Sequence, residues 1–122
     1  LKMEHKKIIY VDIDGTICDT PFRLDDIHDI DKSTHYSQAV PHYSRIDVIN
    51  DLYDKGHNIT YWTARGSVSG IDFTELTRSQ LEEWGCKYHQ LVVGTKPHFD
   101  MYICDKSFNS ESFFHYKERK LP

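Results

Sequence analysis

The run from Ile8 to Thr16 constrains this chain more than any other stretch. Ile8–Val11 is apolar and rich in β-branched residues, which predicts a buried strand. Asp12, Asp14 and Gly15 follow it, and an extended backbone places side chains two residues apart on one face. If the strand ends at the glycine, both carboxylates lie at its carboxyl end, where open α/β sheets bind ligands. Such a pair is costly without a cation or a proton between its members, so it predicts a divalent metal and an anionic substrate.

Strand-like and helix-like patterns alternate along the rest of the chain, which favours a parallel sheet with helical crossovers. The expected elements are a helix from Pro41 to Lys55, a strand from Ile59 to Thr63, a helix opened by a capping box at Asp72 and Glu75, strands from Tyr88 to Val93 and from Met101 to Cys104, and a last helix or loop from Asn109 to Lys120. The expected fold is therefore α/β: a single domain over residues 1–122, with a three-layer Rossmann-like architecture and a central parallel sheet.

Two further predicted strands end in polar side chains. Thr63 closes one of them, and a hydroxyl beside the backbone N–H groups of a turn can bind phosphate oxygens. Lys96 follows the next strand, where an ammonium group would offset clustered negative charge. The plainer interpretations are a threonine that only completes its strand and a lysine at the surface.

Arg65 lies just beyond Thr63 and is the nearest cation able to reach a substrate. One hypothesis gives it contacts with the phosphate or with polar atoms of the leaving group. The alternative is a surface arginine that pairs with a helix carboxylate.

Further acids follow or precede these motifs. Asp105 comes directly after the strand expected from Met101 to Cys104. The segment Asp25–Asp31 is also acidic, but it lacks the glycine and the terminal glutamate of a calcium loop. We expect a solvated acidic loop there.

Composition narrows the classes of partner. The net charge of −4 argues against a general nucleic-acid binder, and the 122 residues hold no apolar run long enough to span a membrane. The 3 cysteines lack the spacing of a zinc site and are odd in number, which favours reduced thiols and a cytoplasmic protein.

The sequence Asp12-Ile13-Asp14-Gly15-Thr16 resembles the first motif, DxDGT, of the haloacid dehalogenase superfamily of phosphatases and phosphotransferases. The resemblance implies that Asp12 is the nucleophile and Asp14 the general acid/base. Thr63 is similar to the second motif, Lys96 to the third and Asp105 to the fourth, although Cys104 stands where many relatives have another acid.

The resemblance also implies a cofactor, Mg²⁺, held by Asp12, the backbone carbonyl of Asp14, and Asp105. Thr63 and Lys96 would bind phosphoryl oxygens. The segments Cys18–Val40 and 67–71 are too short for an inserted domain, so we expect no sizeable cap. The site would then be open, or covered by a second subunit of a homo-oligomer.

The expected activity is magnesium-dependent hydrolysis of a phosphate monoester through an aspartyl phosphate. The middle of the chain is similar to small phosphatases of capsule or polysaccharide biosynthesis, which implies a small phosphorylated substrate such as a sugar phosphate. Two alternatives stay open: a 3′-phosphatase acting on nucleic-acid ends or nucleotides, and a non-catalytic phosphate- or metal-binding module on the same fold.

Overall fold

The computed structural model describes residues 5–23 and 30–115, and its centre is a three-stranded parallel sheet. The strands are β1 (Ile8–Val11), β4 (Asn58–Thr63) and β5 (Gln90–Val93), and they lie in that order. β1 pairs with the first half of β4, and β5 pairs with its second half. The predicted α/β fold with a parallel sheet is confirmed, and the strand order places β1 at an edge.

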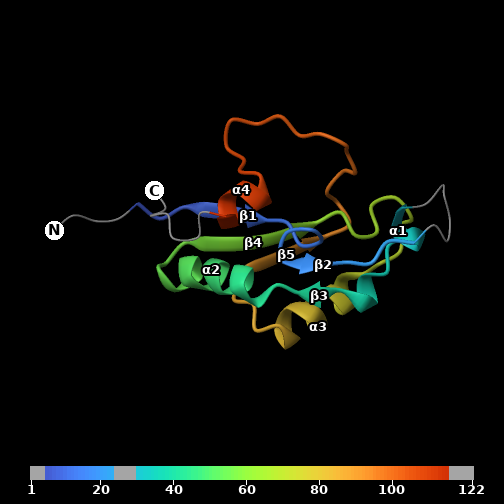
Figure 1. The fold of residues 1–122 in the computed structure, drawn as a ribbon, viewed down its shortest axis with the longest axis horizontal. Helices are drawn as coiled ribbons and strands as arrows, with labels where there is room; N and C mark the ends of the chain where they lie inside the picture. Colours follow the sequence, from blue (N-terminus) through green and yellow to red (C-terminus); the bar gives the residue numbers. More distant parts are fainter. Residues whose placement is uncertain (1–4, 24–29, 116–122) are drawn as a thin grey trace.

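Two helices cover one face of this sheet (Figure 1): α2 (Tyr43–Asp54) and α3 (Thr74–Glu83). The expected helical spacing holds in α2, where Ile46, Ile49 and Leu52 are buried. They pack with Ile59 and Tyr61 of β4 in the main hydrophobic core. None of the helices in the described residues is both long enough and apolar enough to span a bilayer.

The capping box predicted at the start of α3 is wrong. The helix begins at Thr74, its N-cap is Phe73, and no side chain caps it. Asp72 instead accepts a hydrogen bond from the Thr74 N–H at 2.9 Å, so it closes a short turn just before the helix.

The segment between β1 and α2 contains only short elements in its described part. β2 (Cys18–Asp19) and β3 (Val40–Pro41) form an antiparallel pair. Between them lie α1 (Ile30–Ser33) and the 3₁₀ turn η1 (Tyr36–Gln38). These elements place Asp31 and Tyr36 next to the turn that follows β4.

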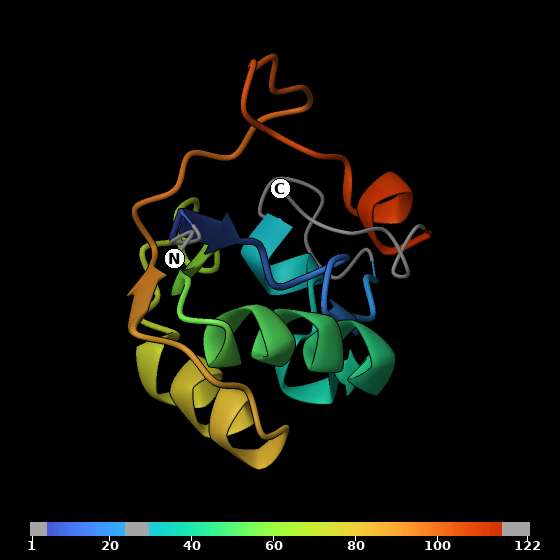
Figure 2. The ribbon, with the colours of Figure 1, turned by 90° about the vertical axis from the view of Figure 1, so that its left-hand side faces the viewer.

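Residues 94–109, which we call the arch, leave β5 and reach away from the sheet before α4 (Ser110–His115), as Figure 2 shows. The strand predicted from Met101 to Cys104 is wrong, since these residues form no strand and Ile103 is 88% exposed. An apolar run becomes a strand only where a neighbouring strand supplies hydrogen bonds and a core takes one face. Neither condition is met in the arch. Among the described residues, the arch and the short α4 lie on the side of the sheet opposite α2 and α3 (Figure 1).

Candidate active site

Asp12, Thr63 and Lys96 lie beyond or at the carboxyl ends of three parallel strands, as the sequence predicts. Asp12 directly follows β1, Thr63 ends β4, and Lys96 follows β5. The Lys96 ammonium donates to Oδ1 of Asp12 at 3.2 Å, and the Thr16 hydroxyl donates to Oδ2 at 3.2 Å. The Asp12 side chain is 40% exposed, so its carboxylate can still meet a ligand from solvent.

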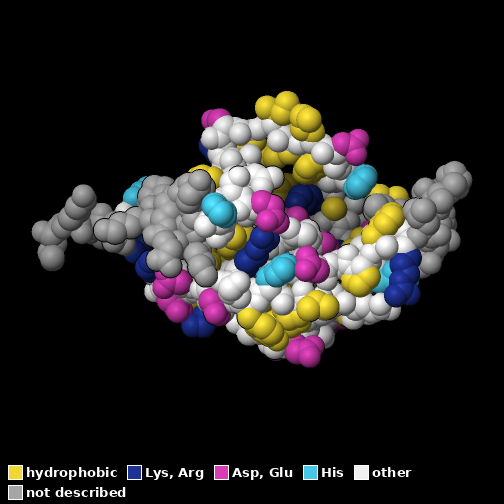
Figure 3. All heavy atoms as spheres, viewed as in Figure 1, with side chains coloured by type: hydrophobic (Ala, Val, Ile, Leu, Met, Phe, Trp, Pro, Cys, Tyr) yellow, Lys and Arg dark blue, Asp and Glu magenta, His cyan; other side chains and the backbone are white. Residues whose placement is uncertain are grey.

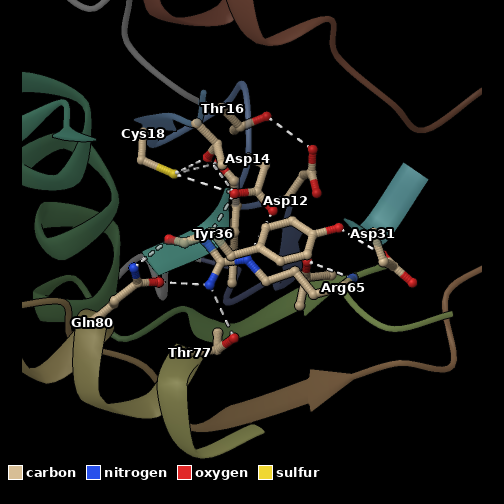
Figure 4. Close-up of polar contacts among 12 residues, drawn as sticks. Asp12, Asp14, Thr16, Cys18, Asp31, Tyr36, Arg65, Thr77 and Gln80 are labelled. Atoms are coloured by element: carbon tan, nitrogen blue, oxygen red, sulfur yellow. Dashed lines mark hydrogen bonds and ion pairs between the residues drawn. The ribbon is translucent and has the colours of Figure 1, made fainter. Parts of the chain in front are cut away.

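Asp14 lies in a different environment, held by a buried arginine (Figure 4). The Arg65 guanidinium donates from Nε to Oδ2 of Asp14 at 2.9 Å and from Nη2 to Oδ1 at 2.8 Å. This two-point contact fixes the plane of the carboxylate as well as its position. The Thr20 hydroxyl also donates to Oδ1, and the Cys18 thiol lies 3.7 Å from it.

The remaining side of the guanidinium faces α3 and η1. Its Nη1 donates to Oγ1 of Thr77 at 3.1 Å and to Oε1 of Gln80 at 2.6 Å. The Tyr36 ring lies against it, with 4.8 Å between the guanidinium carbon and the ring centroid. We call these residues the Arg65 cluster: Asp14, Tyr36, Arg65, Thr77 and Gln80.

Arg65 is only 1% exposed, so neither expectation from the sequence holds. It does not reach solvent to contact a substrate, and it is not a surface residue paired with a helix carboxylate. A buried guanidinium needs a partner for its charge and its N–H groups, and Asp14, Thr77 and Gln80 supply them. Arg65 therefore positions Asp14.

Thr63 lies at the predicted edge but is buried. Its hydroxyl oxygen accepts the Arg65 backbone N–H at 3.2 Å. The structure thus shows Thr63 shaping the turn after β4, and its proposed contact with phosphate needs the hydroxyl to be uncovered.

Asp31 is a buried residue that sequence reasoning missed. It accepts hydrogen bonds from the backbone N–H groups of Gly66 and Ser69 and from the Tyr36 hydroxyl, at 3.1, 2.8 and 2.7 Å. Burial opposes its ionisation, yet these hydrogen bonds outweigh burial and lower the pKa of Asp31. The expected solvated acidic loop is therefore wrong for Asp31, and residues 25–29 lie outside the described residues. Local sequence patterns do not reveal this role, because the backbone donors Gly66 and Ser69 lie 35 and 38 residues away along the chain.

Cys18 is a protonated thiol beside Asp14. Burial raises the pKa of the Cys18 thiol to about 12, and the nearby Asp14 carboxylate adds to the effect. The thiol therefore keeps its proton at neutral pH and is a poor nucleophile.

The three proposed metal ligands are not gathered in this structure. No group of three His, Cys, Asp or Glu side chains in residues 5–23 and 30–115 is placed to hold a metal ion. Asp105 lies on the arch with an exposed side chain. The side-chain oxygens of Asp14 are engaged by Arg65 and Thr20, so the ligand proposed there is its backbone carbonyl. As positioned, these residues do not fit a complete magnesium site.

The fold has a counterpart among solved structures. The chain is similar to a crystal structure of a Vibrio cholerae protein, with a TM-score of 0.65 and 22% sequence identity. The match covers 90% of this chain and 88% of the other, and the description of that protein names no activity. No protein-family model and no curated protein matches the sequence. At this identity the likeness supports the Rossmann-like α/β architecture alone.

Proposed function

We propose that this protein is a phosphate monoester hydrolase that uses Asp12 as its nucleophile. One observation carries the proposal: a partly exposed carboxylate at the carboxyl end of a parallel strand is hydrogen-bonded to Lys96, which follows another strand. An accessible nucleophile beside a cation is what transfer of an anionic phosphoryl group requires. The likeness of Asp12–Thr16 to the phosphatase motif supports the same chemistry.

In the first step, an Asp12 oxygen attacks phosphorus. The new bond joins the carboxylate oxygen to phosphorus, and the bond between phosphorus and the leaving oxygen breaks. Lys96 lies 3.2 Å from Asp12, so its ammonium group can offset the charge of the phosphoryl oxygens as they approach. Thr16 holds the second carboxylate oxygen and restricts its rotation.

In the second step, water attacks the aspartyl phosphate and releases inorganic phosphate. We assign Asp14 the proton transfers: in its protonated form it gives its proton to the leaving oxygen, and the resulting carboxylate then takes a proton from the attacking water, which restores the acid. Arg65 fixes the Asp14 carboxylate by two hydrogen bonds, so the acid/base group does not need to be ordered during the reaction.

The proposal includes Mg²⁺ as a cofactor, with Asp105 as one of its ligands. Bound at the site, the ion would supply positive charge to the phosphoryl group. Because the described residues do not gather three ligands, this part of the proposal requires the arch to bring Asp105 toward Asp12. In a magnesium titration of activity, Asp105→Ala should raise the concentration needed for half-maximal rate. An unchanged titration would remove Asp105 from the proposal.

The nucleophile is tested with Asp12→Asn, because an amide cannot accept the phosphoryl group. We expect loss of all but a trace of magnesium-dependent hydrolysis of an aryl phosphate, with the folding transition retained. Asp19→Asn is the matched control, since the Asp19 side chain is exposed and pairs with His42 at 3.1 Å. Full activity in a folded Asp12→Asn variant would contradict the assignment.

A second candidate function, phosphate binding without hydrolysis, is favoured by the hydrogen bonds of Asp14. Both of its oxygens are engaged by Arg65, as in a carboxylate whose role is structural. The chain would then bind phosphate through Lys96 without turning it over. Single-turnover assays with an aryl phosphate and magnesium separate the two, since only the hydrolase releases the phenol and labels Asp12 with phosphate.

A further inference from the structure

Two pairs of aromatic side chains lie on either side of Lys96. The Tyr10 ring meets Trp62 edge-on at a centroid distance of 5.6 Å, and Phe99 lies 5.6 Å from Tyr102. The Lys96 ammonium joins the two pairs, because it lies 5.3 Å from the Trp62 centroid and 5.9 Å from that of Phe99. We call Tyr10, Trp62, Phe99 and Tyr102 the aromatic strip.

The strip is open to solvent although it is apolar. Tyr10 is 58% exposed, Phe99 44% and Tyr102 61%. The main core packs α2 and α3 against the other side of the sheet, so these rings do not belong to it. Figure 3 shows apolar side chains along the arch above a hollow that contains a basic side chain. Exposed apolar patches of this kind mark binding surfaces.

The position of the strip relates it to the proposed nucleophile. Tyr10 lies in β1 and Asp12 directly follows that strand, and Lys96 contacts Asp12 while its ammonium lies over Trp62, the ring partner of Tyr10. Lys96 contacts both Asp12 and the faces of Trp62 and Phe99. An anion bound by Lys96 would therefore have an aromatic pair on each side, within reach of a ring attached to it.

We propose that the site selects phosphate monoesters whose leaving group carries a ring within a few bonds of the phosphate. The ring is a nucleobase or the apolar face of a sugar, and it stacks on the aromatic strip at Tyr10 or Phe99. An open-chain ester gains nothing from these rings. The net charge of −4 favours a small ester over a polynucleotide. This inference deepens the proposed function and rests on it for turnover, but not for binding.

The test compares ligands that share the phosphate and differ in the ring. Binding of adenosine monophosphate, a hexose phosphate and glycerol phosphate is measured by calorimetry without added metal. We expect the better ring-bearing ester to bind about tenfold more tightly than glycerol phosphate, the scale of one stacked ring. Preference for adenosine monophosphate identifies a nucleobase, and preference for the hexose phosphate identifies a sugar.

The variants Tyr10→Leu and Phe99→Leu locate the effect. We expect at least one of them to bring the affinity for the ring-bearing ester close to that for glycerol phosphate. Tyr43→Leu is the matched control, because Tyr43 is an exposed aromatic residue on α2, remote from the strip in sequence and element. Circular dichroism and thermal unfolding confirm that each variant is folded.

Two outcomes overturn the inference: equal affinities for all three esters, or a ring preference that persists in the double variant Tyr10→Leu/Phe99→Leu. Failure of the proposed function looks different. There, no ester is hydrolysed with magnesium present, while the ring preference in binding remains and still responds to the two substitutions.

Discussion

The Arg65 cluster and the arch lie on two sides of the same site, and they hold their functional groups in opposite ways. Arg65 is buried, and named side chains from three elements fix its guanidinium and, through it, Asp14. The arch carries Lys96 and Asp105 on residues that form no helix or strand, with several large apolar side chains exposed. Folding therefore fixes the groups of the Arg65 cluster. The arch has few packing contacts that could fix Lys96 and Asp105.

This difference shows which part of the site is rigid and which part can change on ligand binding. A buried ion pair is tolerated only with its hydrogen bonds complete, so the Arg65 cluster has one low-energy arrangement. Segments with little buried apolar surface open at low free energy, and binding loops are drawn from such segments. We therefore expect the position of Asp14 to be the same with and without ligand, and the arch to change.

The largest loss of stability should follow from removing the positive charge of Arg65. Arg65→Met leaves the Asp14 carboxylate without its partner and should lower the free energy of unfolding by about 3–5 kcal/mol. Denaturant unfolding measures this loss. In the double variant Arg65→Met/Asp14→Asn the loss should be smaller, because no unpaired charge remains. The control is Arg78→Met, which breaks an exposed pair with Glu75 and should cost no more than about 1 kcal/mol. Similar losses for Arg65→Met and Arg78→Met would contradict the comparison.

Stability should be next most sensitive to substitution in the turn after β4. Gly66 has φ +84°, and an added Cβ would overlap the backbone carbonyl oxygen of Ile71. Gly66→Ala should therefore cost about 2–4 kcal/mol from strain and overlap together. Gly70 has a similar φ of +80° with nothing within 4 Å of an added Cβ, so Gly70→Ala reports the conformational part alone, about 1 kcal/mol. Thermal unfolding of both variants gives the difference, and equal shifts would show that the overlap is relieved.

Acid should weaken the hydrogen bonds by which Asp31 holds the turn after β4. Hydrogen bonds lower the pKa of Asp31 below its usual range, so its ionised form stabilises the fold at neutral pH. The contribution is complete at neutral pH and is lost as the pH falls below about 5 and through the lowered pKa. Asp31→Asn cannot titrate and should cost about 1–3 kcal/mol at pH 7, with a smaller difference from wild type in acid. A difference that stays constant from neutral to acid pH would show that the hydrogen bonds do not depend on the charge.

The smallest effect should come from the arch. Ile103→Ser should change the free energy of unfolding by less than about 0.5 kcal/mol, because the side chain is already in water. Ile59→Ala, at a fully buried position of β4, should cost about 2–5 kcal/mol and is the contrast. A large loss for Ile103→Ser would mean that the arch packs in solution. Hydrogen exchange of arch amides with and without magnesium and phosphate then shows whether ligand orders them.

The predictions of β1 and α2 rest on local patterns and are confirmed, and the prediction that required knowledge of a distant neighbouring strand failed. The strand Ile8–Val11 with Asp12 beyond it, and the buried face of α2, depend on periodicity and on neighbours a few residues away. The predicted meeting of Asp12 and Lys96 depends only on both following strands of one parallel sheet. The strand from Met101 to Cys104 failed because its own pattern carries no information on whether a neighbouring strand is present.

By itself, the sequence determined the order of the sheet strands β1, β4 and β5 and of the helices α2 and α3 between them, the sheet edge where Asp12 and Lys96 meet, and the acidic, DxDGT-like character of that edge. Only the tertiary structure decided what Arg65 and Asp31 do. Both are charged residues that local rules place at the surface, yet both are buried here. The physical reason is that burying a charge is favourable only when partners from distant elements complete its hydrogen bonds. Those partners are Asp14, Thr77 and Gln80 for Arg65, and Tyr36 with the turn after β4 for Asp31.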